Sequence, residues 1–265
     1  MGTFAFKLGA APILIGAASL ASRRWGQAIG GWLVALPLTA GPVIFFLALE
    51  RGAHFASIAA RGCLAGAIAE SAFCVGYMWA ARRFSWVQAL PAGALSFALF
   101  AALLLRLHVG LTPLFLVVIA VIGGILSLVP RGNTSAFAAT PPPWDIPFRM
   151  AAATVAIVLL TAIATVIGPT LSGILAAFPI YASTLTVFAH RSEGWEAAVQ
   201  VLRGLLYGLF AYATFFLTLS LLIIQMTLAS AFFISVVIAL AVQGGSLWAI
   251  RHEASAQAEH CRDQR

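Results

Sequence analysis

The chain has 265 residues, of which 62% are hydrophobic and only 9% are charged, with a formal net charge of +7. Soluble domains carry about 25% charged residues, so this composition excludes a soluble globular protein and indicates an integral membrane protein. The basic residues lie between apolar runs, so we interpret the positive charge as a signal of membrane topology and not of nucleic-acid binding.

The apolar runs predict an all-α fold of nine membrane-spanning helices, because each run has about the 20 residues that a helix needs to cross the hydrocarbon core. No alternation with a period of two indicates a barrel. The first run follows a single basic residue, Lys7, so we interpret it as a retained span and not as a signal peptide. The expected helices are 5–22, 28–49, 54–81, 86–106, 110–129, 148–168, 170–190, 195–223 and 228–250.

The segments outside these helices give the topology. Residues 130–148 contain a run of prolines and are expected to form an extended linker, with a recognition motif as the alternative. Residues 251–265 are expected to be a solvated polar tail. More arginines lie on the side of the loops near residues 23, 82 and 191 than on the other side. The positive-inside rule then places the N-terminus outside and the C-terminus in the cytoplasm.

An offset of 142 residues relates the two halves of the chain, because it separates Pro37 from Pro179. Coincident Pro, Arg and Gly residues are not expected by chance even in this biased composition, so we interpret the offset as an internal duplication. The same offset pairs Lys7 with Arg149, Gly31 with Gly173, Gly52 with Gly194, Arg61 with Arg203, Gly62 with Gly204, and Gly66 with Gly208.

The duplication predicts two four-helix repeats of opposite orientation, since an odd number of spans separates their starts. The first repeat covers 1–109 and the second 149–250, with a connecting helix and the linker at 110–148 and the tail at 251–265. Inverted repeats recur in secondary transporters, whose binding sites lie near the bilayer midplane on interrupted helices.

The second repeat resembles the GlpM-like family of small bacterial inner-membrane proteins. The resemblance depends on "GILAAFP" at 173–179 followed by "AHRSEG" at 189–194, and "LERG" at 49–52 is a weaker copy of the second motif. It covers about 149–250, and more weakly 7–106. The resemblance implies a bacterial inner-membrane location and a fusion of two four-helix units, and it supplies no catalytic residues.

The paired prolines are the first candidate site residues. Pro37 and Pro179 are expected near the middle of their helices, where each would kink the helix and free the carbonyl of Leu33 or Leu175. A packing kink is the plain interpretation. The alternative is a binding cavity, because freed carbonyls in a bilayer need a protein or water partner. The hydroxyl groups that would line this cavity are those of Thr39, Tyr181, Ser183 and Thr184.

Glu70 is the only acidic residue deep within a predicted span. A charged acid at the bilayer centre costs about 2.5 to 3.5 kcal/mol, so Glu70 should face the protein interior, on one stripe with Gly62 and Gly66. Its partner in the repeat is Tyr212. We leave open whether Glu70 couples transport to an ion or a proton, or makes a structural hydrogen bond.

Arg61 and Arg203 are a further repeat pair, each about two turns inside its predicted helix. Their stems can extend to the membrane surface, which is the plain interpretation. Alternatively, the two arginines form cationic entrances for an anionic solute, one at each face.

We therefore expect an inner-membrane secondary transporter or exporter of a small solute, working by alternating access, with protons as a candidate coupling ion. The alternative is a non-transporting accessory protein of an envelope or polysaccharide synthesis complex. No residue pattern predicts an enzyme, a metal site or a cofactor, and Cys63, Cys74 and Cys261 form no disulfide framework. The lipid bilayer is the expected partner, and both a monomer and a homodimer are compatible with the sequence.

Overall fold

The computed structural model describes residues 16–37, 40–106, 109–129 and 169–263, together with positions 13, 146–147, 150–151 and 155. Over these residues the chain is helical and has no strand, which confirms the predicted all-α class. The helices are α2 (Gln27–Val34), α3 (Ala40–Arg51), α4 (Ala53–Ala81), α5 (Trp86–Leu104), α6 (Leu111–Leu128), α8 (Pro169–Ala176), α9 (Ile180–Glu193), α10 (Trp195–Leu222) and α11 (Leu228–Asp263).

Six segments among the described residues are long and apolar enough to cross a membrane. They are Ala53–Ala81, Trp86–Leu104, Leu111–Leu128, Gly173–Glu193, Trp195–Leu222 and Leu228–Trp248. They overlap the third, fourth, fifth, seventh, eighth and ninth helices expected from the sequence. Most of the first and sixth expected helices, and nearly all of the linker at 130–148, lie outside the described residues.

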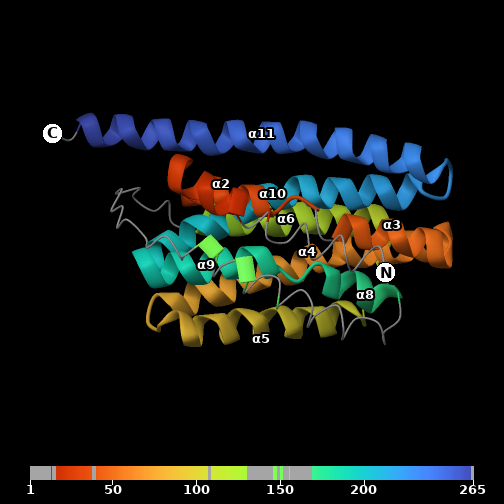
Figure 1. Cartoon of the computed structure of the whole chain (residues 1–265), viewed down its shortest axis with the longest axis horizontal. Coiled ribbons are helices and arrows are strands. Elements are labelled where there is room, and N and C mark those ends of the chain that lie inside the picture. Colours follow the sequence, from red (N-terminus) through yellow and green to blue (C-terminus); the bar gives the residue numbers. More distant parts are fainter. Residues whose placement is uncertain are drawn as a thin grey trace.

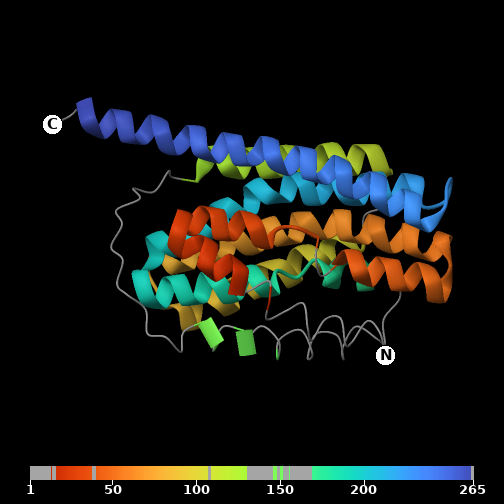
Figure 2. The same ribbon diagram turned by 45° about the horizontal axis from the view of Figure 1, so that its top comes forward.

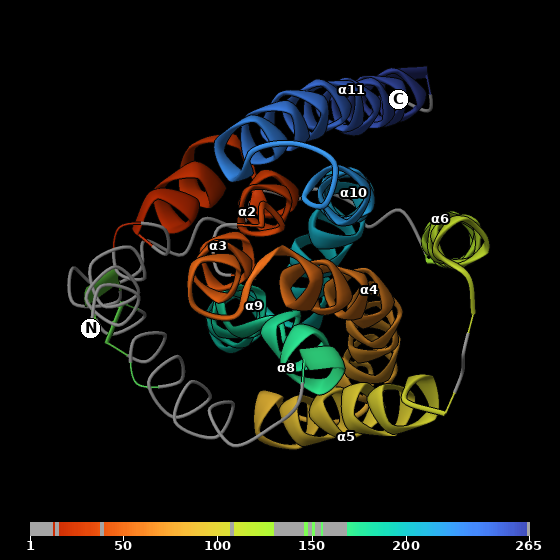
Figure 3. The same cartoon turned by 90° about the vertical axis from the view of Figure 1, so that its right-hand side faces the viewer.

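The helices form a central group and an outer group (Figure 1 and Figure 3). The short helices α2, α3 and α8 lie at the centre with α4, α9 and α10, and helices α5, α6 and α11 lie around them. Most residues of the central spans are buried, whereas most residues of the outer spans are exposed. The exposed side chains of the outer helices are largely aliphatic and aromatic, as lipid contact requires.

Two of the expected helices are broken and not merely kinked. The expected helix at 28–49 is divided into α2 and α3, and the one at 170–190 into α8 and α9. Each break ends at or next to the proline of that helix, where the chain lacks an N–H group. The expected polar tail also differs, because α11 continues as a helix to Asp263 and extends beyond the bundle in Figure 2.

The first half of each broken helix packs closely on a long central helix, α2 on α10 and α8 on α4. The closest approaches are at glycines. A Cβ atom on Gly31 of α2 would overlap the carbonyl oxygen of Val201, and one on Gly173 of α8 would overlap that of Ala59. Helices that associate in lipid use small residues in this way to bring their backbones together.

These contacts recur with the offset of 142 residues. Gly173 follows Gly31 by 142, and Val201 follows Ala59 by the same number, so each contact has a counterpart in which the helices exchange roles. The same exchange relates two further pairs of contacts. They are Gly204 against Ala28 with Gly62 against Thr170, and Gly208 against Ala35 with Gly66 against Ala177.

The two long central helices α4 and α10 run in opposite directions where they touch. Ser57, in the first turns of α4, donates to the carbonyl of Ser220, in the last turns of α10, over 2.9 Å. In return, the hydroxyl of Ser220 donates to the carbonyl of Ser57 over 3.2 Å. Each of these helices follows a glycine with positive φ, Gly52 at 88° and Gly194 at 94°, again 142 residues apart. Residues other than glycine rarely adopt this backbone conformation.

The glycine contacts generate a prediction for Gly173→Ala. The added methyl group has no room against the α4 backbone, so the free energy of unfolding should fall by about 1 to 3 kcal/mol. Thermal unfolding of purified protein in detergent measures the change. Gly124→Ala on α6 is the matched control, because nothing lies within 4 Å of its new Cβ. Equal unfolding temperatures for the two variants would contradict this account of the packing.

Candidate functional site

The break between α8 and α9 is a tight turn centred on Pro179. Pro179 has φ −80° and ψ 63°, and the N–H of Ile180 donates to the carbonyl of Phe178 over 2.8 Å, which is the geometry of an inverse γ-turn. The carbonyl of Leu175, which we expected to be free, instead accepts the N–H of Phe178 over 3.0 Å. The last turn of α8 tightens to close this bond.

The carbonyl left without a local donor is therefore that of Ala176. Its donor three residues on would be Pro179, which has no N–H, and its donor four residues on is Ile180, which is already bonded to Phe178. The expectation of a freed carbonyl thus holds for a residue one position later than predicted.

The break between α2 and α3 has related geometry. The carbonyl of Leu33, also expected to be free, accepts the N–H of Leu36 over a long 3.4 Å. The carbonyl of Pro37 accepts the N–H of Gly41 over 2.8 Å, and that of Pro179 accepts the N–H of Ser183 over 2.7 Å. Both prolines thus begin the second half of a broken helix in the same way.

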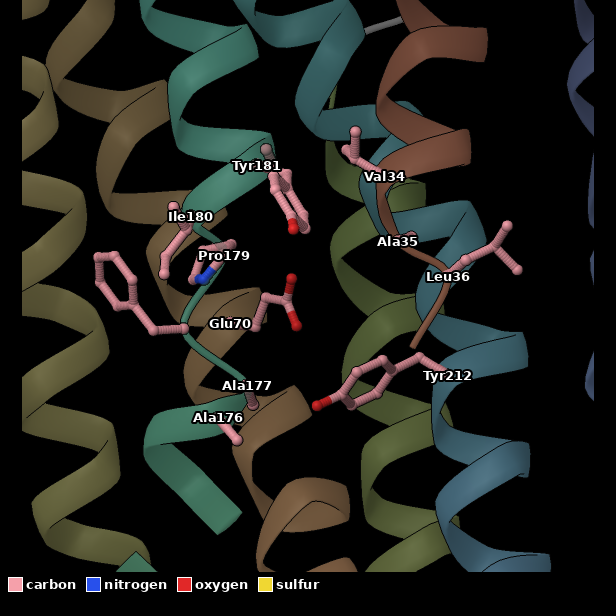
Figure 4. A pocket seen from close by; sticks show the side chains of 12 residues that line it. Val34, Ala35, Leu36, Glu70, Ala176, Ala177, Pro179, Ile180, Tyr181 and Tyr212 are labelled. Carbon is pink, nitrogen blue, oxygen red and sulfur yellow. The ribbon is translucent and has the colours of Figure 1, made fainter. Parts of the chain in front are cut away.

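A small cavity lies where the two breaks meet. Its walls come from both breaks and from the long helices α4 and α10, as Figure 4 shows. The space open to the centre of a water molecule is about 20 Å³, which is room for about one water molecule. The lining residues are Val34, Ala35, Leu36, Glu70, Ala176, Ala177, Phe178, Pro179, Ile180, Tyr181, Ala182 and Tyr212.

Glu70 provides the acidic group of this cavity. Its side chain is 5% exposed, and in Figure 4 its carboxyl group lies between the hydroxyl groups of Tyr181 and Tyr212. Neither a lysine, an arginine nor a histidine is among the lining residues. Among the described residues, none forms a hydrogen bond or an ion pair with the Glu70 carboxyl group. The acid is therefore free to bind a proton or a cation that enters the cavity.

Tyr212 is the repeat counterpart of Glu70 and faces the same space. Its hydroxyl group is buried and makes no hydrogen bond of normal geometry with any described residue, although the thiol of Cys63, a weak hydrogen-bonding group, lies beside it. A buried hydroxyl without a partner is unusual in a native protein and indicates a water molecule or a ligand. Tyr212 is thus a second polar group available to an occupant of the cavity.

Four helix ends surround the cavity. Residues of the last turns of α2 and α8 line it, and so do the first residues of α9. The last carbonyl groups of a helix carry partial negative charge, and the first N–H groups carry partial positive charge. The carboxylate of Glu70 beside the start of α9 is stabilised by these N–H groups, and a cation in the cavity is stabilised by the carbonyl ends.

The structure brings only some of the predicted site residues to the cavity. Glu70, Pro179, Tyr181 and Tyr212 line it, and the residues directly before Pro37 do so as well. Thr39 lies outside the described residues. The hydroxyls of two further predicted residues, Ser183 and Thr184, both donate to the carbonyl of Ile180, over 2.9 and 2.8 Å, and are not among the lining residues.

Arg61 and Arg203 hold the two ends of α6 and do not line the cavity. Arg203 is 4% exposed and donates to the carbonyl of Val129, at the C-terminal end of α6, over 2.6 Å. Arg61 is exposed and donates to the carbonyl of Val109, which precedes the first turn of α6. The arginine at the C-terminal end also complements the partial negative charge there.

Several cavity residues were missed by the sequence reasoning. The aromatic Phe178 and the aliphatic residues on either side of the breaks provide most of the wall. The available signal was their position, because these residues immediately precede a proline in each half of the chain. Their small or apolar side chains gave no chemical reason to select them.

Comparison of the chain with models of known protein families, with curated proteins and with solved structures gave no match.

The arginine contacts generate a prediction for Arg203→Met. The variant loses a hydrogen bond from a buried charged group, so the free energy of unfolding should fall by about 1.5 to 3 kcal/mol. Arg61→Met is the matched control at the other end of α6, and it should lose less because Arg61 is exposed to solvent or headgroups. Thermal unfolding in detergent measures both variants. An equal or larger loss in Arg61→Met would contradict the difference in burial.

Proposed function

We propose that the protein is a secondary transporter of the bacterial inner membrane, working by alternating access about the cavity at the two helix breaks. The observation that carries the proposal is the unpaired acid Glu70 in a cavity formed by two interrupted helices. Interrupted helices near the bilayer midplane are the binding elements of many secondary transporters. Glu70 is the coupling residue, which binds a proton in one step of the cycle and releases it in another.

The cavity chemistry favours a proton or a small cation over the anionic solute expected from the sequence. The lining residues include one acid and no basic group. An anion beside Glu70 would meet a like charge, whereas a cation would meet the carboxylate, the tyrosine hydroxyls and the partial negative ends of α2 and α8. In this proposal Arg61 and Arg203 fix α6 and do not guide the solute.

Two inverted repeats are part of the proposal. The supporting observations are the helix contacts that exchange with an offset of 142, the opposite directions of α4 and α10, and the matching breaks. In an inverted pair, each repeat adopts in turn the conformation that its partner has just left, which exchanges the open side of the cavity. The relation to GlpM-like proteins and the placement of the C-terminus in the cytoplasm belong to the same proposal.

The proposal predicts transport that depends on Glu70. In proteoliposomes with an imposed pH gradient, lumenal pH is followed with a dye while small inorganic cations and amines are added outside. At least one compound should dissipate the gradient in the wild type, and Glu70→Gln should match protein-free liposomes because an amide cannot exchange a proton. A wild type that responds to no compound, or a fully active Glu70→Gln variant, would contradict the proposal.

A second prediction tests the equivalence of the two halves. Glu70→Tyr should abolish transport, and the double variant Glu70→Tyr with Tyr212→Glu should recover it, because the acid then occupies the counterpart position in the same cavity. The assay is the same liposome measurement, with the unfolding temperature of each variant as the folding control. A well-folded double variant without activity would show that the two positions are not equivalent.

A further inference from the structure

The described residues contain a group of buried polar atoms that have no hydrogen-bond partner. Seven such side-chain atoms occur, and besides those of Tyr212 and Gln243 they gather in one region. They belong to Ser19, Ser22, Gln27, Thr186 and Gln200. Ser19 and Thr186 are 0% exposed and Ser22 is 4% exposed. Native proteins rarely bury polar groups without partners, so a cluster of them indicates bound water.

These atoms lie between the cavity and one end of the bundle. On α9, Ala182 lines the cavity, and positions four, seven and eleven residues later are Thr186, Ala189 and Glu193, which share its helix face. From Ala182 to Glu193 this face is about 16 Å long. It ends where the side-chain amide of Gln27 donates to the carboxylate of Glu193 over 2.7 Å.

The helical segment 16–25 and the start of α10 cover this face. Ala18 packs with Leu185, Ala189 and Val201 in one buried cluster, and Val34, a cavity residue, packs against it. Ser19 and Ser22 follow Ala18 by one and four positions, and Gln200 precedes Val201. The unpartnered polar atoms therefore lie along a path from the exposed end at Glu193 to the cavity. We call this path the polar lane.

The other side of the cavity has no such path among the described residues. The counterparts of Thr186, Ser183 and Gln200 at an offset of 142 are Ile44, Gly41 and Ile58. Ile44 is 0% exposed, and a Cβ on Gly41 would lie 3.7 Å from the ring of Phe215. The ring of Phe215 packs edge-on against Phe216 and Phe232, with centroid distances of 4.9 and 6.1 Å. This side is closed by aliphatic and aromatic side chains.

We propose that protons reach Glu70 from the Glu193 end through a file of water molecules held by the polar lane. A hydronium ion at the cavity transfers its proton to the Glu70 carboxylate, which forms an O–H bond there and leaves a neutral water molecule. The titratable groups facing Glu70 are Tyr181, Tyr212, Cys63 and Cys74, none of which is a basic residue. The inference rests on the proposed function only in the role it gives to Glu70.

The test measures water access with Ag⁺, a thiol-reactive ion small enough for a narrow path. Thr186→Cys and the matched control Ile44→Cys are made in a background with Cys63→Ala, Cys74→Ala and Cys261→Ala. Sealed membrane vesicles of each orientation are treated with Ag⁺, which replaces the thiol proton. After denaturation, the remaining thiols are counted with a fluorescent maleimide. Arg191→Cys, at an exposed position near Glu193, identifies the side on which the lane opens.

Thr186→Cys should react from the side that Arg191→Cys identifies, about 100-fold faster than Ile44→Cys, because an ion in dry apolar surroundings is strongly disfavoured. Ser22→Cys should react like Thr186→Cys and serves if that variant does not fold. Equal slow reaction of the lane variants and Ile44→Cys would overturn the lane, as would equal fast reaction of all three. The liposome assay of Glu70→Gln uses the native cysteines, so failure of the lane leaves the transporter proposal standing, and the reverse also holds.

Discussion

A proline has no N–H group, and inside a membrane the carbonyl that loses its donor can find no water in the lipid. Backbone of this kind is tolerated at membrane depth only where other protein covers it. Here the short helices on either side of each break lie in the centre of the bundle, and α4 and α10 cover them through glycines that allow backbone contact. The close packing at Gly31 and Gly173, the cavity and the position of Glu70 all follow from this need to cover two interrupted helices.

The difference between Glu70 and Tyr212 gives the cavity its chemistry. Two acids at these counterpart positions would repel one another in a small, poorly hydrated space, and one carboxyl group would then be held protonated. One acid facing a tyrosine hydroxyl avoids this repulsion and leaves a single site for a proton or cation. The same division recurs along the access route, where Thr186 in one half corresponds to Ile44 in the other. Equivalent backbone positions thus carry different polarity on the two sides of the cavity.

The repeat-paired arginines have a mechanical role in this arrangement. Arg61 and Arg203 each donate to a carbonyl at one end of α6, the helix that joins the two halves of the chain. Helix α6 is otherwise mostly exposed, so these bonds fix both of its ends against the central helices. A transporter that exchanges the open side of its cavity needs its two halves to remain connected while they move. Contacts at the ends of a connecting helix meet this need without crowding the cavity.

The sequence by itself determined the membrane class, the approximate helix ranges, the offset of 142 and the importance of Glu70, because hydrophobic length, proline chemistry and buried charge act locally. It could not determine that the helices break at Pro37 and Pro179 instead of bending, that the free carbonyl belongs to Ala176, or that Ser183 and Thr184 bond within α9. Those outcomes depend on which backbone and side-chain groups compete for each donor. Only the packing of α2 on α10 and α8 on α4 decided which residues meet, since residues far apart in the chain form the cavity together.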